Sequence, residues 1–277
     1  MSASTLSKAK EASVSDSAKK LIQSAAQEGT ISPATAKALT VHDVGMEIEA
    51  ALGVNVDDVK STEVVLVTFL IDDSGSIEGA GNTANVMLGH NLVLDALMKT
   101  KQKNNILVHT RTLNGTIITP YCLLENAVQL DASNYFPVGG TPLYDETVVI
   151  LGTVIAKTEQ FSKNAVPVRT VTIIITDSCD LHSRKYRRPQ DVAPIVQDMF
   201  KTEQHIIAGM GIDDHQTDFK KVFGDMGILP QWILTPDNDP HEIRKAFLMV
   251  SQSATKISQN AQGFAQASLG GFGKTAP

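Results

Sequence analysis

Two short apolar runs constrain the fold of this chain more than any other feature of its sequence. Residues 64–71 read VVLVTFLI and residues 168–176 read VRTVTIIIT, and both are rich in β-branched side chains. Runs of this length are too short to cross a bilayer. Since they lack the alternation of a half-exposed strand, each is predicted to be a strand buried on both faces, as in a parallel sheet.

Helical patterns and further strand patterns alternate with these two runs. Helices are predicted at about 84–101, 143–161, 193–202, 218–224 and 240–253, and strands at 106–112, 115–119, 205–211 and 232–235. Such alternation favours an α/β fold, with a Rossmann-like, mainly parallel sheet and helices on both faces. Leu113-Asn114 is a hairpin turn that adds one antiparallel edge strand. This domain is predicted to span residues 61–254.

The two ends of the chain differ from its centre. Residues 1–60 are predicted to form a helical N-terminal appendage, because residues 44–52 carry the apolar stripe of an amphipathic helix. Residues 255–277 are rich in Gly, Ser and Gln, a composition that buries little apolar surface. They are therefore predicted to be a flexible tail.

Composition limits the classes of function. Lys and Arg number 24 against 30 for Asp and Glu, so a net charge of −6 gives no case for a nucleic-acid partner. The two cysteines cannot form the framework of a disulfide-stapled secreted fold. The sequence shows neither a secretory signal nor a membrane span, so we expect a cytoplasmic protein without a membrane partner. Its oligomeric state stays open.

Oxygen-bearing side chains gather where the predicted strands end. Asp72, Ser74 and Ser76 follow the first run, Asp177 follows the second, and Thr141 lies in a Gly/Pro loop between them. In an open parallel sheet, ligands bind at this edge. An all-oxygen set suits a hard cation such as Mg²⁺ or Mn²⁺, and is poor for zinc or copper. Two carboxylates balance the charge of a dication. The site is expected to keep at least one coordination position of the ion for water or an incoming carboxylate.

The order and spacing of these residues resemble a known family. The segments are Asp72-x-Ser74-x-Ser76, Gly140-Thr141-Pro142-Leu143-Tyr144-Asp145 and Thr176-Asp177. Together they resemble the metal-ion-dependent adhesion site of von Willebrand factor type A (VWA) domains, over roughly residues 62–250. One residue departs from the pattern: many members have Gly where this chain has Ser178.

The resemblance implies both a ligand set and a kind of partner. It implies that Ser74, Ser76 and Thr141 bind Mg²⁺ directly. It also implies that Asp72 and Asp177 lie close to the ion and often contact it through water. A partner protein's Asp or Glu completes the metal shell in this family. The chain is similar to the intracellular members of the family. Those members often serve as adaptors for AAA-type ATPases or belong to bacterial stress and metal-resistance systems.

Two classes of function remain open. The first is a metal-dependent protein-interaction module without catalysis, and the alternative is a Mg²⁺-dependent phosphoesterase or other hydrolase on the same scaffold. The sequence nominates no general base or nucleophile. Cys179 is more readily explained as a small buried apolar residue than as a nucleophile.

Ordinary structural roles compete with these interpretations. The segment Asp72–Ser76 could by itself be a polar turn that caps a helix, and Asp73, Asp145 and Asp180 are predicted to be caps or loop carboxylates. A basic run, Arg184, Lys185, Arg187 and Arg188, is either a solvated loop or a surface that steers an acidic partner towards the metal.

Overall fold

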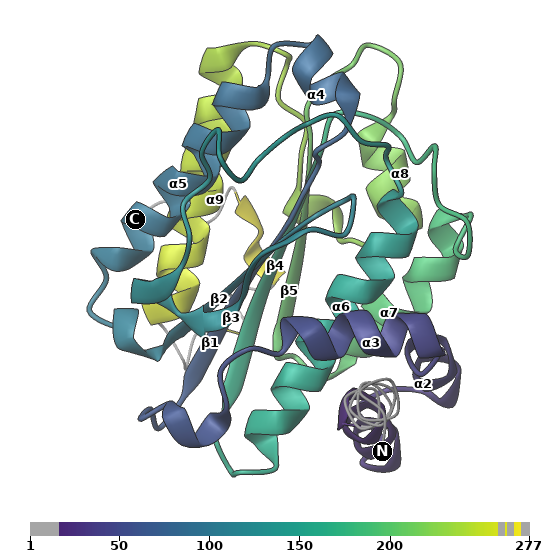
Figure 1. Ribbon diagram of the computed structural model, residues 1–277, viewed down its shortest axis with the longest axis vertical. Coiled ribbons are helices and arrows are strands. Elements are labelled where there is room, and N and C mark those ends of the chain that lie inside the picture. The colour runs from purple at the N-terminus through teal and green to yellow at the C-terminus, as the bar shows by residue number, and fades with distance from the viewer. Residues whose placement is uncertain (1–16, 260–263, 265–268, 273–277) are drawn as a thin grey trace, which may run out of the picture.

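A mainly parallel sheet forms the centre of the molecule (Figure 1). The computed structural model describes residues 17–259, 264 and 269–272, and within them the sheet has six strands in the order β3-β2-β1-β4-β5-β6. The strands are β1 (Val64–Ile71), β2 (Ile106–Thr112), β3 (Ile117–Leu123), β4 (Val168–Thr176), β5 (His205–Gly211) and β6 (Ile233–Leu234). All neighbours pair in parallel except β2 and β3. The predicted fold class is confirmed.

The two apolar runs lie side by side at the middle of this sheet. Every residue of β1 and of β4 is buried. They pair along their whole length, with Val64 opposite Val168 and Ile71 opposite Ile175. Because both faces of both strands are covered, each strand is apolar throughout and does not alternate.

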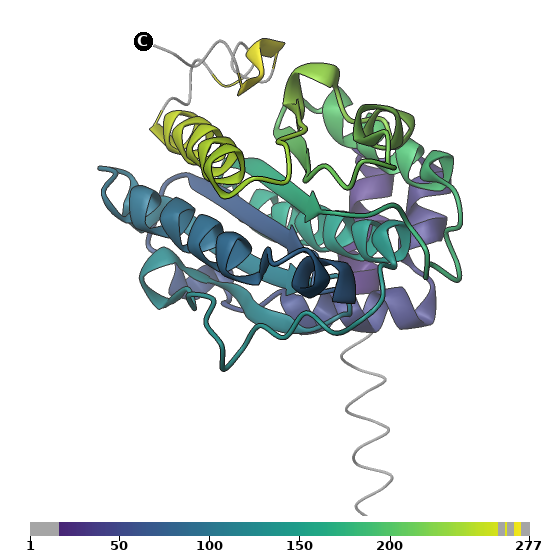
Figure 2. The same cartoon turned by 90° about the horizontal axis from the view of Figure 1, so that it is seen from above.

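Helices cover both faces of the sheet. They are α2 (Pro33–Leu39), α3 (His42–Ala51), α4 (Gly75–Gly79), α5 (Thr83–Met98), α6 (Leu143–Ser162), α7 (Pro189–Lys201), α8 (Phe219–Asp225) and α9 (Pro240–Gln259). Helices α5 and α9 lie together on one face, and α6 and α7 lie on the other (Figure 2). Gly89 permits the close approach of α5 and α9, since the ring of Phe247 occupies the space that a side chain there would need.

The N-terminal helices form an outer layer over α6 and α7 (Figure 1). They comprise a helix at residues 17–27, α2 and α3. Asp198 of α7 accepts a hydrogen bond from the backbone N–H of Ser32, at 2.8 Å. Gly152 of α6 leaves room for the side chain of Ile48. The predicted appendage thus packs on the sheet domain along its described length, while its residues 1–16 lie outside the described part of the chain.

The C-terminal helix is longer than the sequence pattern predicts. Helix α9 continues to Gln259, past the predicted helix end at 253 and the predicted domain end at 254, because Ala254 and Ile257 are buried. Further on, Phe272 packs edge-on against Trp232, with ring centroids 4.9 Å apart. Residues 255–259 of the predicted tail are therefore part of α9. The rest of that predicted tail, at 260–263, 265–268 and 273–277, lies outside the described residues.

Several other boundaries differ from the prediction. Helix α7 begins at Pro189 and includes Pro194, which is exposed, so that water can satisfy the carbonyl left without an N–H partner. Strand β3 runs from 117 to 123 and β6 has only two residues. The short helix α4 was not predicted, because five residues carry no periodic apolar signal.

A glycine joins the N-terminal layer to the edge of the sheet, and it provides a test of the packing. Gly53 has φ of +60°, and a Cβ atom there would lie 2.0 Å from the backbone oxygen of Tyr121. We expect Gly53→Ala to lower the free energy of unfolding by more than about 2 kcal/mol, since backbone cannot move aside cheaply. Gly45→Ala is the control: nothing lies near its Cβ position, so the change should stabilise α3 by about 0.5–1 kcal/mol. Urea unfolding of both variants measures the difference, and equal effects would contradict the assigned contact.

Candidate metal centre

Asp72 is held in place by the pairing of the two central strands. Its backbone N–H donates to the carbonyl oxygen of Ile175 at 2.9 Å, which extends the β1–β4 ladder one residue beyond β1. One carboxylate oxygen accepts from the hydroxyl of Thr176 at 2.6 Å, and the other accepts from the backbone N–H of Ser74 at 2.8 Å. The two hydrogen bonds therefore hold the carboxylate in one defined orientation.

The structure brings the five predicted site residues together. The hydroxyl oxygens of Ser74 and Ser76 lie 2.8 Å apart, and the Ser76 hydroxyl donates to the Asp177 carboxylate at 2.6 Å. Ser178, the residue that departs from the family pattern, also belongs to this cluster. Its hydroxyl lies 3.1 Å from that of Thr141 and 3.5 Å from that of Ser76. The result is a continuous group of hydroxyl and carboxylate oxygens.

Asn114 positions the loop that carries Thr141. Its side-chain nitrogen donates to the carbonyl oxygen of Gly140, and its side-chain oxygen accepts from the N–H of Gly140, each at 3.0 Å. Asp73 in turn accepts from the Asn114 side chain at 2.7 Å. A side chain at Gly139 would collide with Asn114. The sequence analysis missed this role, because the segment Leu113-Asn114 signals only a turn and not the loop that it contacts.

His182 holds Thr141 from the opposite side. Its Nδ1 accepts from the backbone N–H of Thr141 at 2.9 Å, so the proton of the neutral ring lies on Nε2. The backbone N–H of Leu181 donates to the carbonyl oxygen of Thr141 at 3.1 Å. The ring of His182 also fills the space beside Gly140. No spacing of histidines in the sequence could have indicated this contact.

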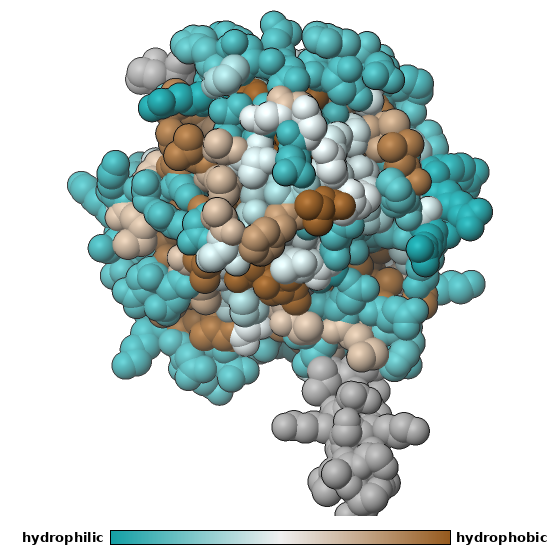
Figure 3. Space-filling model, turned by 45° about the horizontal axis from the view of Figure 1, so that its top comes forward, coloured by the Kyte–Doolittle hydropathy of each residue, from teal (hydrophilic) through white to brown (hydrophobic). Residues whose placement is uncertain are grey.

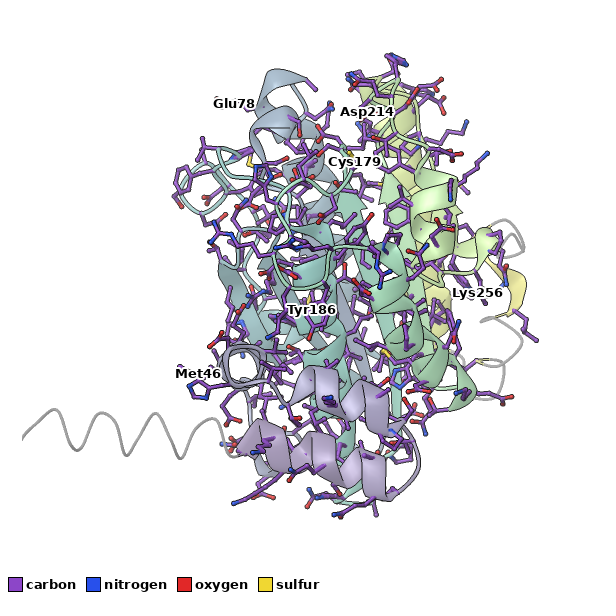
Figure 4. The ribbon with its side chains drawn as sticks, turned by 90° about the vertical axis from the view of Figure 1, so that its right-hand side faces the viewer. Met46, Glu78, Cys179, Tyr186, Asp214 and Lys256 are labelled. Atoms are coloured by element: carbon purple, nitrogen blue, oxygen red, sulfur yellow. The ribbon has the colours of Figure 1, made fainter. Side chains whose placement is uncertain are left out.

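Of the acidic residues predicted to be caps or loop carboxylates, Asp73 and Asp180 lie in loops, and Asp180 accepts from the backbone N–H of Tyr144 in the first turn of α6. Asp145 lies in that first turn and not in a loop. Asp145 accepts from the backbone N–H groups of Arg184 and Tyr186, both at 2.7 Å, and so shapes the basic run. Cys179 lies toward the end of the molecule that also carries Glu78 and Asp214 (Figure 4). It is half-buried and not buried as predicted.

The two central carboxylates are buried without a basic partner. Asp72 is fully buried and Asp177 is 4% exposed. Burial raises the pKa of Asp72, and burial, helped by the charges of Asp72 and Asp214, raises the pKa of Asp177 to about 6. Among the described residues, the ion pairs involve neither carboxylate. A bound dication would offset this negative charge, so the donor set fits such an ion.

The cluster differs from metal sites built on histidine, cysteine or several carboxylates. Across the described residues, no group of three or more His, Cys, Asp or Glu side chains could hold a metal ion. The oxygens gathered here come mainly from neutral hydroxyls, with only two carboxylates. That composition suits a hard ion which keeps part of its shell for water or another ligand.

Comparison with known proteins identifies the fold. No protein-family model and no curated protein matches the sequence. The pilus adhesin SpaC from Lactobacillus rhamnosus GG, in its open conformation, is 14% identical, with a TM-score of 0.50 over 70% of this chain and 30% of the adhesin. A second SpaC structure gives 13% identity and a TM-score of 0.52 over 70% and 31%.

The similarity to SpaC shows the fold alone. The chain spans less than a third of the length of that adhesin. The arrangement is the α/β fold of VWA domains, with its mainly parallel sheet and single antiparallel edge strand. No helix in the described part of the chain is long and apolar enough to cross a membrane.

The role of Asn114 can be tested by hydrogen exchange. Asn114→Ala removes the acceptor for the Gly140 N–H, so we expect that amide to exchange about tenfold faster in NMR measurements. Asn164→Ala is the control, because its side chain caps only the carbonyl of Gln160 near the end of α6. Unchanged exchange at Gly140 in the Asn114 variant would show that other contacts hold the loop.

Proposed function

We propose that the chain is a non-catalytic protein-interaction module that binds a partner through a divalent metal, Mg²⁺ or Mn²⁺. The proposed ligands are Asp72, Ser74, Ser76, Thr141 and Asp177. The observation that supports this most directly is the cluster itself: three loops bring hydroxyls onto two buried carboxylates that have no basic partner. The metal would supply a positive centre that attracts a partner's Asp or Glu.

The residues divide into two roles in this proposal. The hydroxyls of Ser74, Ser76 and Thr141 bind the ion directly, whereas Asp72 and Asp177 supply its balancing charge, in part through water. Asp72 already accepts two hydrogen bonds, from Ser74 and Thr176, which favours an indirect role for it. The hydroxyl of Ser178 offers a further neutral oxygen beside Thr141. Because neutral donors predominate, the ion can still attract an incoming carboxylate.

The alternative function, a Mg²⁺-dependent phosphoesterase or other hydrolase, lacks a supporting observation. Such an enzyme needs a base or nucleophile that is free to act beside the metal. The histidine nearest to the loop, His182, uses its Nδ1 to accept from the backbone of Thr141. The test is hydrolysis of p-nitrophenyl phosphate in the presence of Mg²⁺ or Mn²⁺. Activity that the Asp177→Ala variant loses would favour the enzyme over the interaction module.

The biological setting is also part of the proposal. We place the protein inside the cell, because Cys122 and Cys179 are free thiols, as expected in a reducing compartment. An adaptor for an AAA-type ATPase, or a component of a stress or metal-resistance system, would suit a metal-dependent interaction module. The fold also occurs in a pilus adhesin, so cell fractionation with an antibody to this chain is the deciding measurement.

Metal titration tests the site. We expect Thr141→Val and Asp177→Ala to weaken Mg²⁺ or Mn²⁺ binding by tenfold or more, about 1.4 kcal/mol, because each removes one oxygen donor or one balancing charge. Asp57→Ala is the control: it removes the same charge from an exposed position in the turn Val56–Asp58. Isothermal titration calorimetry measures all three against the unchanged chain.

Equal metal affinity in all four proteins would contradict the assignment of the metal ligands. A chelator should leave the circular dichroism spectrum unchanged, because buried strands and not the metal hold the sheet together. A chelator-induced loss of structure would mean that the ion has a structural role and not the docking role proposed here.

A further inference from the structure

Three large apolar side chains stand exposed at the rim of the candidate metal centre. Phe136 is 59% exposed, Val138 is 76% exposed and Leu181 is 67% exposed. Figure 3, in which the end of the molecule that carries α4 is turned forward, shows hydrophobic atoms near the middle of this face. An exposed apolar group beside a polar site is typical of a binding surface.

The exposure of these side chains is a regular feature of their loop. In the segment 135–138, Tyr135 and Pro137 are buried, whereas Phe136 and Val138 point outward. The hydroxyl of Tyr135 donates to the backbone oxygen of Asp72, which ties the loop to β1. The outward direction of Phe136 and Val138 is therefore set by an anchored backbone.

Backbone contacts place Val138 and Leu181 next to segments that carry proposed ligands, and Phe136 precedes Val138 by two residues. Val138 directly precedes Gly139, whose carbonyl oxygen accepts from the N–H of Gly75 at 3.0 Å. Leu181 donates its N–H to the carbonyl oxygen of Thr141 at 3.1 Å. Val138 and Leu181 thus lie on segments hydrogen-bonded to those of the cluster, with Phe136 two residues from Val138, and we call Phe136, Val138 and Leu181 the apolar collar.

We infer that the apolar collar receives large apolar side chains on either side of the carboxylate that a partner presents to the metal. The occupant is a protein segment in which an Asp or Glu is flanked by residues such as Leu, and not a purely acidic segment. The metal contact fixes the orientation of the bound segment, and burial of the collar adds affinity, since apolar side chains are removed from water. This inference rests on the proposed function.

Defined peptides test the inference on the full chain. Three glycine-rich peptides are immobilised through biotin: one with a single glutamate between two leucines, one with serines in place of the leucines, and one with glutamine in place of the glutamate. In Mg²⁺, biolayer interferometry should show the leucine-flanked glutamate binding at least about tenfold more tightly than the serine-flanked one. The glutamine peptide should not bind.

Two matched variants test whether the apolar collar causes the preference for the leucine-flanked peptide. The combined change of Phe136→Ser, Val138→Ser and Leu181→Ser should abolish the tenfold advantage but leave Mg²⁺ affinity in calorimetry unchanged. Leu88→Ser is the control, because Leu88 is 69% exposed on α5 and lies outside the collar. It should retain the full preference.

The outcomes separate the two claims. If the unchanged chain does not bind Mg²⁺, the proposed function fails. If it binds Mg²⁺ but binds no peptide, or binds the two glutamate peptides equally, only the inference about the apolar collar is overturned. A Mg²⁺-dependent dimer in analytical ultracentrifugation that the combined variant loses would also overturn it, because a second copy of the chain would then occupy the collar.

Discussion

The parallel register between β1 and β4 is the constraint on which the rest of the site depends. With Ile71 opposite Ile175, the ladder extends by one hydrogen bond, so that Asp72 lies beside Thr176 and one residue from Asp177. A slip of one residue would turn every side chain of a strand to the other face of the sheet. The same apolar contacts that stabilise the core therefore determine where two carboxylates meet.

The loops beyond the strands are held by polar contacts that do not involve the proposed ligand atoms. Asp73 orients Asn114, which holds both polar groups of Gly140, and His182 accepts from the backbone N–H of Thr141. Glycine at 139 and 140 leaves the space that these two side chains occupy. A binding site supported in this way is arranged before any ligand arrives, which lowers the entropic cost of binding.

Burying two carboxylates together has an energetic cost, because each charge loses its contact with water. Burial raises the pKa of both Asp72 and Asp177, yet each has hydrogen-bond donors from neighbouring hydroxyls. Their charge is confined to one edge of a sheet whose stability comes from fully buried strands. In the proposed function this negative charge attracts a cation, and the exposed Phe136, Val138 and Leu181 contact a partner.

The sequence by itself determined the strands at 64–71, 168–176 and 205–211, the fold class and the residues that meet at the candidate site. These features depend on runs of apolar side chains and on turn residues, which act over a few neighbouring positions. Only the tertiary structure decided the contacts between distant segments. Asn114 on Gly140, His182 on Thr141 and Ser178 within the hydroxyl cluster have no local signature. Helix α9 continues past 253 for the same reason: burial of Ile257 depends on what the folded chain places beside it.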